Sequence, residues 1–421
     1  MTDTPPLAQT LLPKTGSEDL LTTDALITDA LDFVRSHLNM EVAYLSEFIG
    51  DDLVFRAVSA PGFEELCHVG GTMSLDQVYC RHILAGRLPE LIPDTGAEPI
   101  CQGLPLTQDI PIRSHVSVPI RRSDGSPYGM FCCLSRSVRS DLTPRDLNVM
   151  RAFSNVAADH LNDRISAQVT RAKIRQEVQD IMQDTAFDLA FQPIVDIKSG
   201  QPKGFEALCR FRSSPYRPPN LWFDDARQVD LQVDLELAVI ENALTALAVL
   251  PQDIYLSVNA SPDTVASGRL APLFQPHPCE RILLEVTEHS QILDYDELHS
   301  ELLRLRFFGV RLAIDDAGAG YSGLQHIVRL QPDVIKLDMS LTRDICSDPV
   351  RRSLAGALVR FGAEIDAVIV AEGVETEAEL KTLDGLGVPL AQGYFLGKPA
   401  SLDTAVTWFD PGSTSDIPMS G

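Results

Sequence analysis

The segments RILLEVTE (281–288) and VRLAIDD (310–316) decide the fold of the C-terminal half of the chain. Each is an almost continuous apolar run that ends in acidic residues, and the stretch between them is long enough for a helix. Such runs are typical of parallel strands whose two faces are both covered by other elements. The pair therefore predicts two neighbouring parallel strands that carry carboxylates at their carboxyl ends.

Six further segments after residue 185 repeat the pattern of a short apolar strand. They are LAFQPIVDI (189–197), GFEALCRF (204–211), IYLSVNA (254–260), DVIKLD (333–338), AVIVAEG (367–373) and LAQGYFLG (390–397). A stretch long enough for a helix separates each strand from the next, except between the first two. Eight strands that alternate with helices predict a TIM-like (β/α)8 barrel, an α/β fold.

The N-terminal half has a different pattern, which predicts an α+β domain with an antiparallel sheet and flanking helices. Apolar residues recur at helical spacing over 23–37, and strand-forming residues occupy four later segments. These segments are 42–48, 53–59, 117–121 and 128–134. Asp124 and Gly125 are expected to form the turn between the last two strands.

One long helix is expected over 144–183, and it connects the two halves. Its first half should bury one face, made of Leu147, Met150, Phe153, Val156, Leu161 and Ile165. Its second half has apolar residues only for a narrow seam, which favours contact with a second copy of the chain; a solvated connector in a monomer is the alternative. The expected organisation is a disordered tail (1–20), a sensory domain (21–165), a linker helix (166–185), a barrel (186–408) and a second disordered tail (409–421).

The composition of the 421 residues indicates a globular protein and limits its partners. The hydrophobic share of 44% and the charged share of 22% are ordinary for folded proteins. The net charge of −24 repels DNA and anionic membranes, so a phosphate ligand needs local cations. The eight cysteines include no C-x-x-C pair, which argues against a zinc site or a disulfide framework. We find no signal peptide and no run long enough for a membrane span, and we expect a cytoplasmic protein.

Polar side chains recur within or at the ends of the predicted barrel strands. They are Glu206, Asn259, Glu285, Asp315, Asp316, Lys336 and Glu372. The carboxyl ends of barrel strands meet at one mouth, where crowded carboxylates repel one another unless cations neutralise them. Carboxylate and amide oxygens, without His or Cys, suit Mg²⁺ or Mn²⁺ rather than Zn²⁺.

Each of these residues taken alone has a purely structural explanation. Asp315 and its acidic neighbour could cap a helix or shape a turn. Lys336 could pair with Asp338, and Glu372 could cap the helix that follows it. Asn259 could form a turn. Their joint placement on different strands is what favours a metal site.

Residues 189–405 resemble the EAL-type cyclic di-GMP phosphodiesterases, named after the tripeptide that is Glu206-Ala207-Leu208 here. Around this tripeptide stand seven ordered motifs: FQPIVDIKSG (191–200), SVNAS (257–261), EVTE (285–288), DDAGAGYSGL (315–324), DVIKLD (333–338), AEGVET (371–376) and QGYFLGKP (392–399). The resemblance implies a TIM-like barrel that hydrolyses cyclic di-GMP to linear pGpG with two divalent metals.

The resemblance also implies the ligands of the two metals. One metal would be held by Glu206, Asn259, Glu285 and Asp315. The second would be held by Asp315, Asp316 and Glu372, so that Asp315 bridges the pair.

Further roles follow from the same matches. Lys336 would hydrogen-bond the water between the metals and Glu372 would act as general base, which with Glu206 makes three expected catalytic residues. The positions that match substrate-binding residues are Gln192, Arg210 and Gln392. Glu288 matches the residue that anchors the loop after Asp315.

The sequence departs from the family pattern at Ala317, where a Phe is usual. That loop couples metal binding to dimer contacts in the family, so the smaller side chain predicts a lower rate. A catalytically weak or inactive cyclic di-GMP receptor is the alternative function. An unrelated metal-dependent lyase with Lys336 as its base is a third possibility, and a nucleic-acid regulator is disfavoured by the charge.

The N-terminal half resembles a GAF sensory domain. The resemblance rests on YCRHILAGRLPELIPDT (79–95), HVSVPIRRSDGSPYGMFCCLS (115–135) and DLNVMRAFSNVAADHL (146–161). It implies that an unknown small ligand or signal binds this domain. We expect a homodimer in which that signal shifts the long helix and so regulates the barrel.

Overall fold

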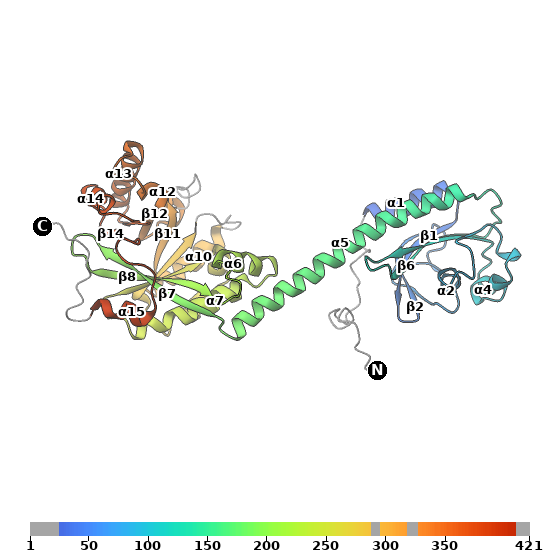
Figure 1. Ribbon diagram of the computed structural model, residues 1–421, viewed down its shortest axis with the longest axis horizontal. Helices are drawn as coiled ribbons and strands as arrows, with labels where there is room; N and C mark the ends of the chain where they lie inside the picture. The colour runs from blue at the N-terminus through green and yellow to red at the C-terminus, as the bar shows by residue number, and fades with distance from the viewer. Residues whose placement is uncertain (1–24, 288–294, 318–326, 410–421) are drawn as a thin grey trace. The chain divides into compact units, whose positions relative to one another are not determined.

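The computed structural model describes residues 25–287, 295–317 and 327–409, and the chain forms two compact units (Figure 1). The first unit ends at Thr170 and the second begins at Arg171. No helix in these described ranges combines the length and the apolar character that crossing a bilayer requires. All eight cysteines are free thiols, and seven of them are buried.

The first unit is built on a six-stranded antiparallel sheet with the strand order β3-β2-β1-β6-β5-β4. Its elements are α1 (Ala25–His37), β1 (Val42–Ile49), β2 (Asp52–Ser59), β3 (Thr72–Ser74), α2 (Cys80–Leu84), β4 (Leu91–Ile92), η2 (Thr95–Ala97), α3 (Pro99–Gln102), α4 (Pro105–Asp109), β5 (Ser114–Arg121), β6 (Pro127–Ser135) and the first part of α5 (Pro144–Gln183). The predicted helix and the four predicted strands are confirmed. The elements that the sequence pattern missed have only two to five residues each.

The turn between β5 and β6 has the chemistry that the sequence predicted. Asp124 accepts a hydrogen bond at Oδ1 from the Ser126 amide at 2.8 Å. Gly125 has a φ of +82°, in the left-handed region that glycine adopts without steric cost. These two residues therefore reverse the chain and align β5 with β6.

The sheet of the first unit separates two apolar layers. Helices α1 and α5 cover one face, and the short helices α2 and α4 lie on the other (Figure 1). Met150 and Leu161 of α5 are fully buried, as predicted. The prediction for Val156 was wrong, because its side chain is 67% exposed. Val156 lies at the rim of the apolar stripe, where helical periodicity does not distinguish a buried position from an exposed one.

The second half of α5 packs on the barrel unit through several of its apolar residues. Val178 and Ile181 are buried beside Phe211 and Trp222, and Ile174 packs against the same cluster. Arg171 donates a hydrogen bond at 2.7 Å to a carboxylate in the turn between the first two barrel helices. These apolar residues are therefore used within the chain. Val169 is 51% exposed, and the seam with a second copy stays a prediction.

The second unit is a closed barrel with the strand order β10-β11-β12-β13-β14-β7-β8-β9. Its elements are β7 (Phe187–Asp196), β8 (Pro202–Phe211), α6 (Pro219–Gln228), α7 (Gln232–Leu244), η3 (Thr245–Ala248), β9 (Tyr255–Ala260), α8 (Pro262–Ala266), α9 (Leu270–Phe274), η4 (Cys279–Arg281), β10 (Ile282–Thr287), α10 (Tyr295–Phe307), β11 (Arg311–Ala317), β12 (Val334–Leu337), α12 (Met339–Thr342), α13 (Pro349–Glu364), β13 (Val368–Ala371), α14 (Glu377–Gly385), β14 (Leu390–Ala391), α15 (Leu402–Val406) and η5 (Thr407–Phe409). The predicted eight-stranded barrel is confirmed.

Strand β7 runs antiparallel to both of its neighbours, β8 and β14, which departs from an all-parallel barrel. The reason is the connection between β7 and β8, which has too few residues for a crossover helix. It closes as a hairpin in which the Asp196 carboxylate accepts a hydrogen bond from the Ser199 amide at 2.7 Å. The remaining strand pairs are parallel, so their carboxyl ends meet at one mouth.

The predicted tails fall almost entirely outside the described residues. Phe409 is the exception, since it ends the last helical turn. Glu288 and the remainder of the DDAGAGYSGL motif, residues 318–324, also lie outside the described ranges.

His115 in β5 is a buried polar residue, with an exposed fraction of 1%. Its ring packs edge-on against Tyr79, with 4.9 Å between the ring centroids. Nδ1 has no hydrogen-bond partner among the described residues. Burial lowers the pKa of His115 to about 3, because the charged imidazolium would lose its hydration.

We expect His115 to make the stability of the first unit depend on pH. Below about pH 6.5 the unfolded state takes up a proton that the folded state excludes, so the unfolding free energy falls by about 2 kcal/mol on reaching about pH 5. Near neutral pH both states are uncharged and the effect vanishes. Calorimetric unfolding of His115→Leu should lack this loss, whereas the control His299→Leu, at an exposed position on α10, should retain it. An unchanged loss in His115→Leu would contradict the assignment.

Candidate functional site

The polar residues predicted at the strand ends lie on consecutive strands of the barrel. They are Glu206 on β8, Asn259 on β9, Glu285 on β10, Asp315 on β11, Lys336 on β12 and Glu372 directly after β13. The parallel register places Glu285 directly beside Asn259, and Thr287 beside Asp315. Backbone pairing therefore brings side chains that are far apart in sequence to the same end of the barrel.

Lys336 stands at the centre of this group, with an exposed fraction of 1%. Its Nζ lies within ion-pair distance of four carboxylates: 2.7 Å from Glu285 Oε2, 2.7 Å from Glu372 Oε1, 3.2 Å from Asp315 Oδ1 and 3.4 Å from Glu206 Oε2. One ammonium neutralises one of four negative charges if all four carboxylates are ionised. The cluster therefore keeps an excess of negative charge.

Burial and mutual repulsion set the ionisation of this cluster. Burial raises the pKa of Glu285 well above its usual value and that of Glu372 to about 8. In Glu206 burial acts in the same direction, but the Lys336 ammonium and two amide hydrogen bonds hold its pKa below the usual value. Burial opposes the charge of Lys336, yet the surrounding carboxylates raise its pKa well above the usual value.

Amide side chains join Glu206 to the substrate-binding positions that the sequence predicted. Asn259 Nδ2 donates to Glu206 Oε1 at 2.9 Å, and Gln392 Nε2 donates to Glu206 Oε2 at 2.7 Å. Gln392 Nε2 also donates to Gln192 Oε1 at 3.0 Å. Gln392 therefore contacts the cluster directly, and Gln192 is joined to it through Gln392. Arg210, four residues after Glu206, donates to the backbone oxygen of Cys209 instead.

The glycine after Gln392 is required by a close backbone approach. A Cβ at Gly393 would lie 2.2 Å from both the nitrogen and the oxygen of Val374. The Val374 amide donates to the Gln392 carbonyl at 3.1 Å. This contact holds the end of β14 against the segment that follows Glu372, and so keeps Gln392 at the barrel mouth.

The purely structural explanations of the site residues are not borne out for three of them. Lys336 does not pair with Asp338, whose side chain caps α12 by accepting from the Ser340 amide. Helix α14 is capped by Thr376, whose side chain accepts from the Glu379 amide while the Glu379 side chain accepts from the Thr376 amide. Glu372 therefore does not cap this helix. Asn259 lies in a strand rather than in a turn.

Two of the predicted residues lie partly or wholly outside the described structure. The backbone of Asp316 lies in β11, and its side chain lies outside the described part of the structure, as does all of Glu288. Ala317 is buried, with an exposed fraction of 1%, and pairs with Leu337.

Ser257 is a member of the site that the sequence reasoning missed. It is fully buried in β9, and its Oγ donates to Glu285 Oε1 and lies 3.3 Å from the Leu283 carbonyl oxygen. The available signal was its position two residues before Asn259, because alternate residues of a strand face the same side. Ser257 thus fixes one oxygen of the most deeply buried carboxylate.

The donor set fits divalent cations that prefer oxygen ligands. Gln392 Oε1 is buried and unpaired among the described residues, whereas Asp315 Oδ1 has there only its ion pair with Lys336 at 3.2 Å. Among those residues, no three Glu, Asp, His or Cys side chains already surround one point as metal ligands; the carboxylates surround Lys336 Nζ. The excess negative charge and the unpaired oxygen both favour a cation at this mouth.

Two known domain families match this chain. The EAL domain model matches residues 175–399, which is more than half of the chain. The chain belongs to the EAL domain family. The GAF domain model matches residues 21–162, which confirms the expected N-terminal domain.

Named relatives are similar to this chain over part of its length. The probable cyclic di-GMP phosphodiesterase PdeD of Escherichia coli is 30% identical over 256 residues, which cover 58% of this chain and 47% of that protein. A cyclic di-GMP phosphodiesterase of Pseudomonas aeruginosa is 29% identical over 322 residues, which cover 73% of this chain and 53% of that protein. The chain therefore spans about half the length of these relatives.

A solved structure supports the same fold for the EAL domain. The phosphodiesterase PaMucR, in its complex with c-di-GMP, matches 55% of this chain and 99% of its own with a TM-score of 0.50 and 29% identity.

We expect Lys336→Met to destabilise the EAL domain strongly. Removing the ammonium leaves four carboxylates in a buried cluster, and breaking a buried ion pair from one side costs about 3–5 kcal/mol. Lys381→Met is the matched control, because Lys381 pairs with Glu377 at 2.8 Å on the surface of α14, where a pair contributes less than about 1 kcal/mol. Urea unfolding in the presence of a chelator measures both variants. Equal losses would contradict a central role for the Lys336 ammonium.

Proposed function

We propose that this EAL protein hydrolyses cyclic di-GMP to linear pGpG with two divalent cations, Mg²⁺ or Mn²⁺. The observation that carries the proposal is the group of four carboxylates from different strands that converge on Lys336. Two relatives of this chain are named as a probable and as a cyclic di-GMP phosphodiesterase, which supports the choice of substrate. The overall charge of −24 makes local cations necessary for any phosphate ligand.

The proposed ligands divide between two metal positions. Glu206, Asn259, Glu285 and Asp315 would hold one cation, and Asp315, Asp316 and Glu372 would hold the other. Two such cations, when bound, lower the pKa of a shared water and stabilise negative charge on the phosphodiester oxygens.

The side chains of the chain itself would complete the reaction. Lys336 would donate a hydrogen bond to the attacking water, and Glu372 would accept a proton from that water as general base. Gln192 and Gln392 would orient the substrate beside Glu206, and Arg210 would bind a phosphate oxygen. Attack on one phosphodiester opens the ring, and the second phosphodiester stays intact in the linear product.

We expect the full chain to convert cyclic di-GMP to pGpG only with Mg²⁺ or Mn²⁺ present. Asp315→Asn should lower turnover by more than about 100-fold, since even substitutions behind the ligands of a metal cost about 10- to 100-fold. The control is Asp366→Asn, an exposed position before the amino end of β13, away from the mouth. Chromatography of the nucleotides measures the product. Binding of cyclic di-GMP without any pGpG would instead favour a receptor.

The GAF domain contains a hollow that supports the proposal of a small ligand. It is open to solvent, has an empty volume of about 830 Å³, and includes the aromatic rings of Tyr44, Phe55 and Phe63 in its lining. At its rim the guanidinium of Arg136 lies 4.5 Å from the Phe63 ring centroid and pairs with Glu41 at 3.1 Å. An apolar ligand that carries one polar group would suit this lining.

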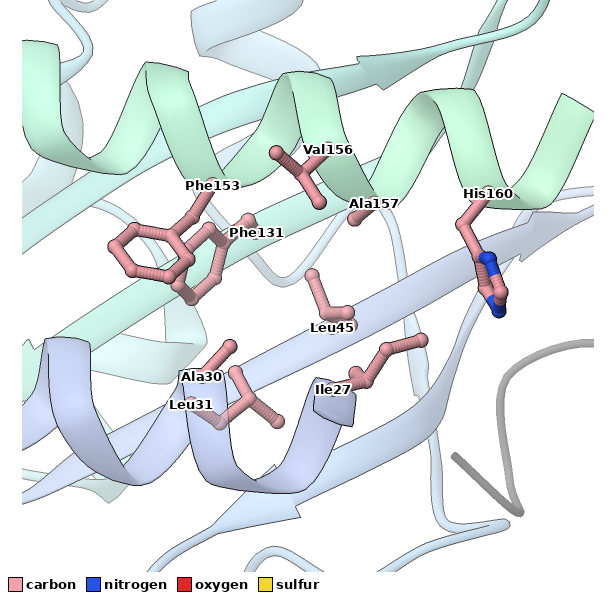
Figure 2. A pocket seen from close by; sticks show the side chains of 9 residues that line it. All are labelled: Ile27, Ala30, Leu31, Leu45, Phe131, Phe153, Val156, Ala157 and His160. Atoms are coloured by element: carbon pink, nitrogen blue, oxygen red, sulfur yellow. The ribbon is translucent and has the colours of Figure 1, made fainter. Parts of the chain in front are cut away.

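The homodimer is proposed to form through α1 and the first half of α5. An apolar hollow of about 530 Å³, open to solvent, lies between these helices. Figure 2 shows the side chains of Phe153, Leu31 and Ile27 in its lining. Val156 at its edge is 67% exposed, and Phe33 on α1 is 58% exposed. A face that has both projecting apolar side chains and a hollow can pack on its own two-fold copy, which would form a four-helix bundle.

We expect Val156→Glu to dissociate this dimer, because a charge on the apolar face would lose its hydration on pairing. Val249→Glu is the control, since Val249 is 56% exposed on the EAL unit. Sedimentation of the full chain gives the mass. A monomeric control variant, or a dimeric Val156→Glu, would contradict this interface. Because α5 also packs on the EAL unit, regulation through α5 further predicts an altered turnover in Val156→Glu.

A further inference from the structure

Glu236 on α7 is a buried carboxylate that none of the proposed roles uses. Its exposed fraction is 8%, and its Oε2 accepts two hydrogen bonds from Ser261, one from the amide at 2.8 Å and one from Oγ at 2.9 Å. Ser261 is the N-cap of α8, where its Oγ also accepts from the Thr264 amide. The carboxylate thus holds the backbone at the point where β9 ends and α8 begins.

The other oxygen of Glu236 is fixed as well. Gln232 Nε2 donates to Glu236 Oε1 at 2.8 Å, and Arg227 Nε donates to Gln232 Oε1 at 3.0 Å. A buried carboxylate held only through neutral donors is a costly element of a fold, because its hydration is lost without a direct cation. Apolar packing between α7 and β9 would stabilise the domain without that cost. The arrangement therefore suggests a positional role.

Ser261 is two residues from Asn259, whose Nδ2 donates to Glu206 Oε1 at 2.9 Å. The backbone between these two residues is short and extended, so a shift of the Ser261 amide moves the Asn259 side chain. Metal ligands must keep their distances to within about 0.2 Å. The position of Ser261 therefore bears directly on the geometry of the Asn259 and Glu206 pair.

We propose that Glu236 is a positioning residue of the metal site, which holds Asn259 in place through Ser261. The proposal rests on the proposed function, since it assigns a support to one of its metal ligands. It places the support on α7, whose first residue Gln232 lies directly after the turn to which Arg171 of α5 is bonded. The metal site is thereby joined to the helix that enters the EAL domain.

The test is the affinity of the full chain for Mn²⁺, measured by titration calorimetry without substrate. Glu236→Ala should weaken Mn²⁺ binding by about 10- to 100-fold, the range typical of residues that support metal ligands. Glu236→Gln retains an acceptor for the Ser261 amide and should recover part of the affinity. Ser261→Thr, which keeps the hydroxyl, should bind more tightly than Ser261→Ala. The control Glu241→Ala, exposed on the same helix, should bind like the wild type.

A merely structural role predicts a different result. The midpoint temperature of thermal unfolding would then fall in Glu236→Ala, while the Mn²⁺ affinity of the folded variant stayed the same. This result would overturn the proposal. If Glu236→Ala does not fold, an unchanged affinity in both Glu236→Gln and Ser261→Ala would overturn it equally. Wild-type pGpG formation is measured in parallel: Mn²⁺ binding without hydrolysis contradicts the proposed function alone, whereas a wild type that binds no Mn²⁺ contradicts both.

Discussion

The contact between the Lys336 ammonium and the carboxylates around it is the constraint on which the rest of the EAL domain depends. Four acidic side chains from separate strands meet at one buried amine, and Glu285 and Glu372 lie closest, at 2.7 Å. Burial removes the water that would otherwise offset the charge of such a cluster, so cations or retained protons must offset it. One lysine offsets only part of the charge of four ionised carboxylates. In the proposed function, the remaining charge would attract divalent cations and, through them, an anionic phosphodiester to a protein that would otherwise repel it.

Around Lys336, neighbouring polar residues hold the carboxylates and Asn259, the proposed metal ligands, in place. Ser257 holds an oxygen of Glu285 from inside the barrel, and Asn259 and Gln392 hold the two oxygens of Glu206. Farther out, Glu236 holds the end of the strand that bears Asn259. Catalysis by metal ions requires ligands that are placed before the substrate arrives, and supporting hydrogen bonds provide that placement. Gln232, at the start of α7, follows the turn that Arg171 of α5 contacts, which supports the proposed regulation through α5.

The sequence predicted what depends on local pattern and failed where the answer depends on distant elements. The apolar runs and their terminal acids identified the barrel and the residues of its mouth. The reversed direction of β7 follows from the short link around Ser199. The sequence showed that this link has no room for a helix, but the prediction of the barrel did not include the reversal. Val156 fits a buried stripe by periodicity but lies at the rim of that stripe, where it is 67% exposed. Ser257 and Glu236 gain their roles from partners 28 and 25 residues away, which no local pattern indicates.

The central claim is that these carboxylates hold two cations at the mouth of the barrel. Anomalous diffraction from crystals of the full chain grown with Mn²⁺ and cyclic di-GMP tests it most directly. The account predicts two manganese peaks per chain, one beside Glu206 and Asn259 and one beside Glu372, with Asp315 between them. Peaks at other surfaces only, or a mouth in which Lys336 alone occupies the centre, would contradict it.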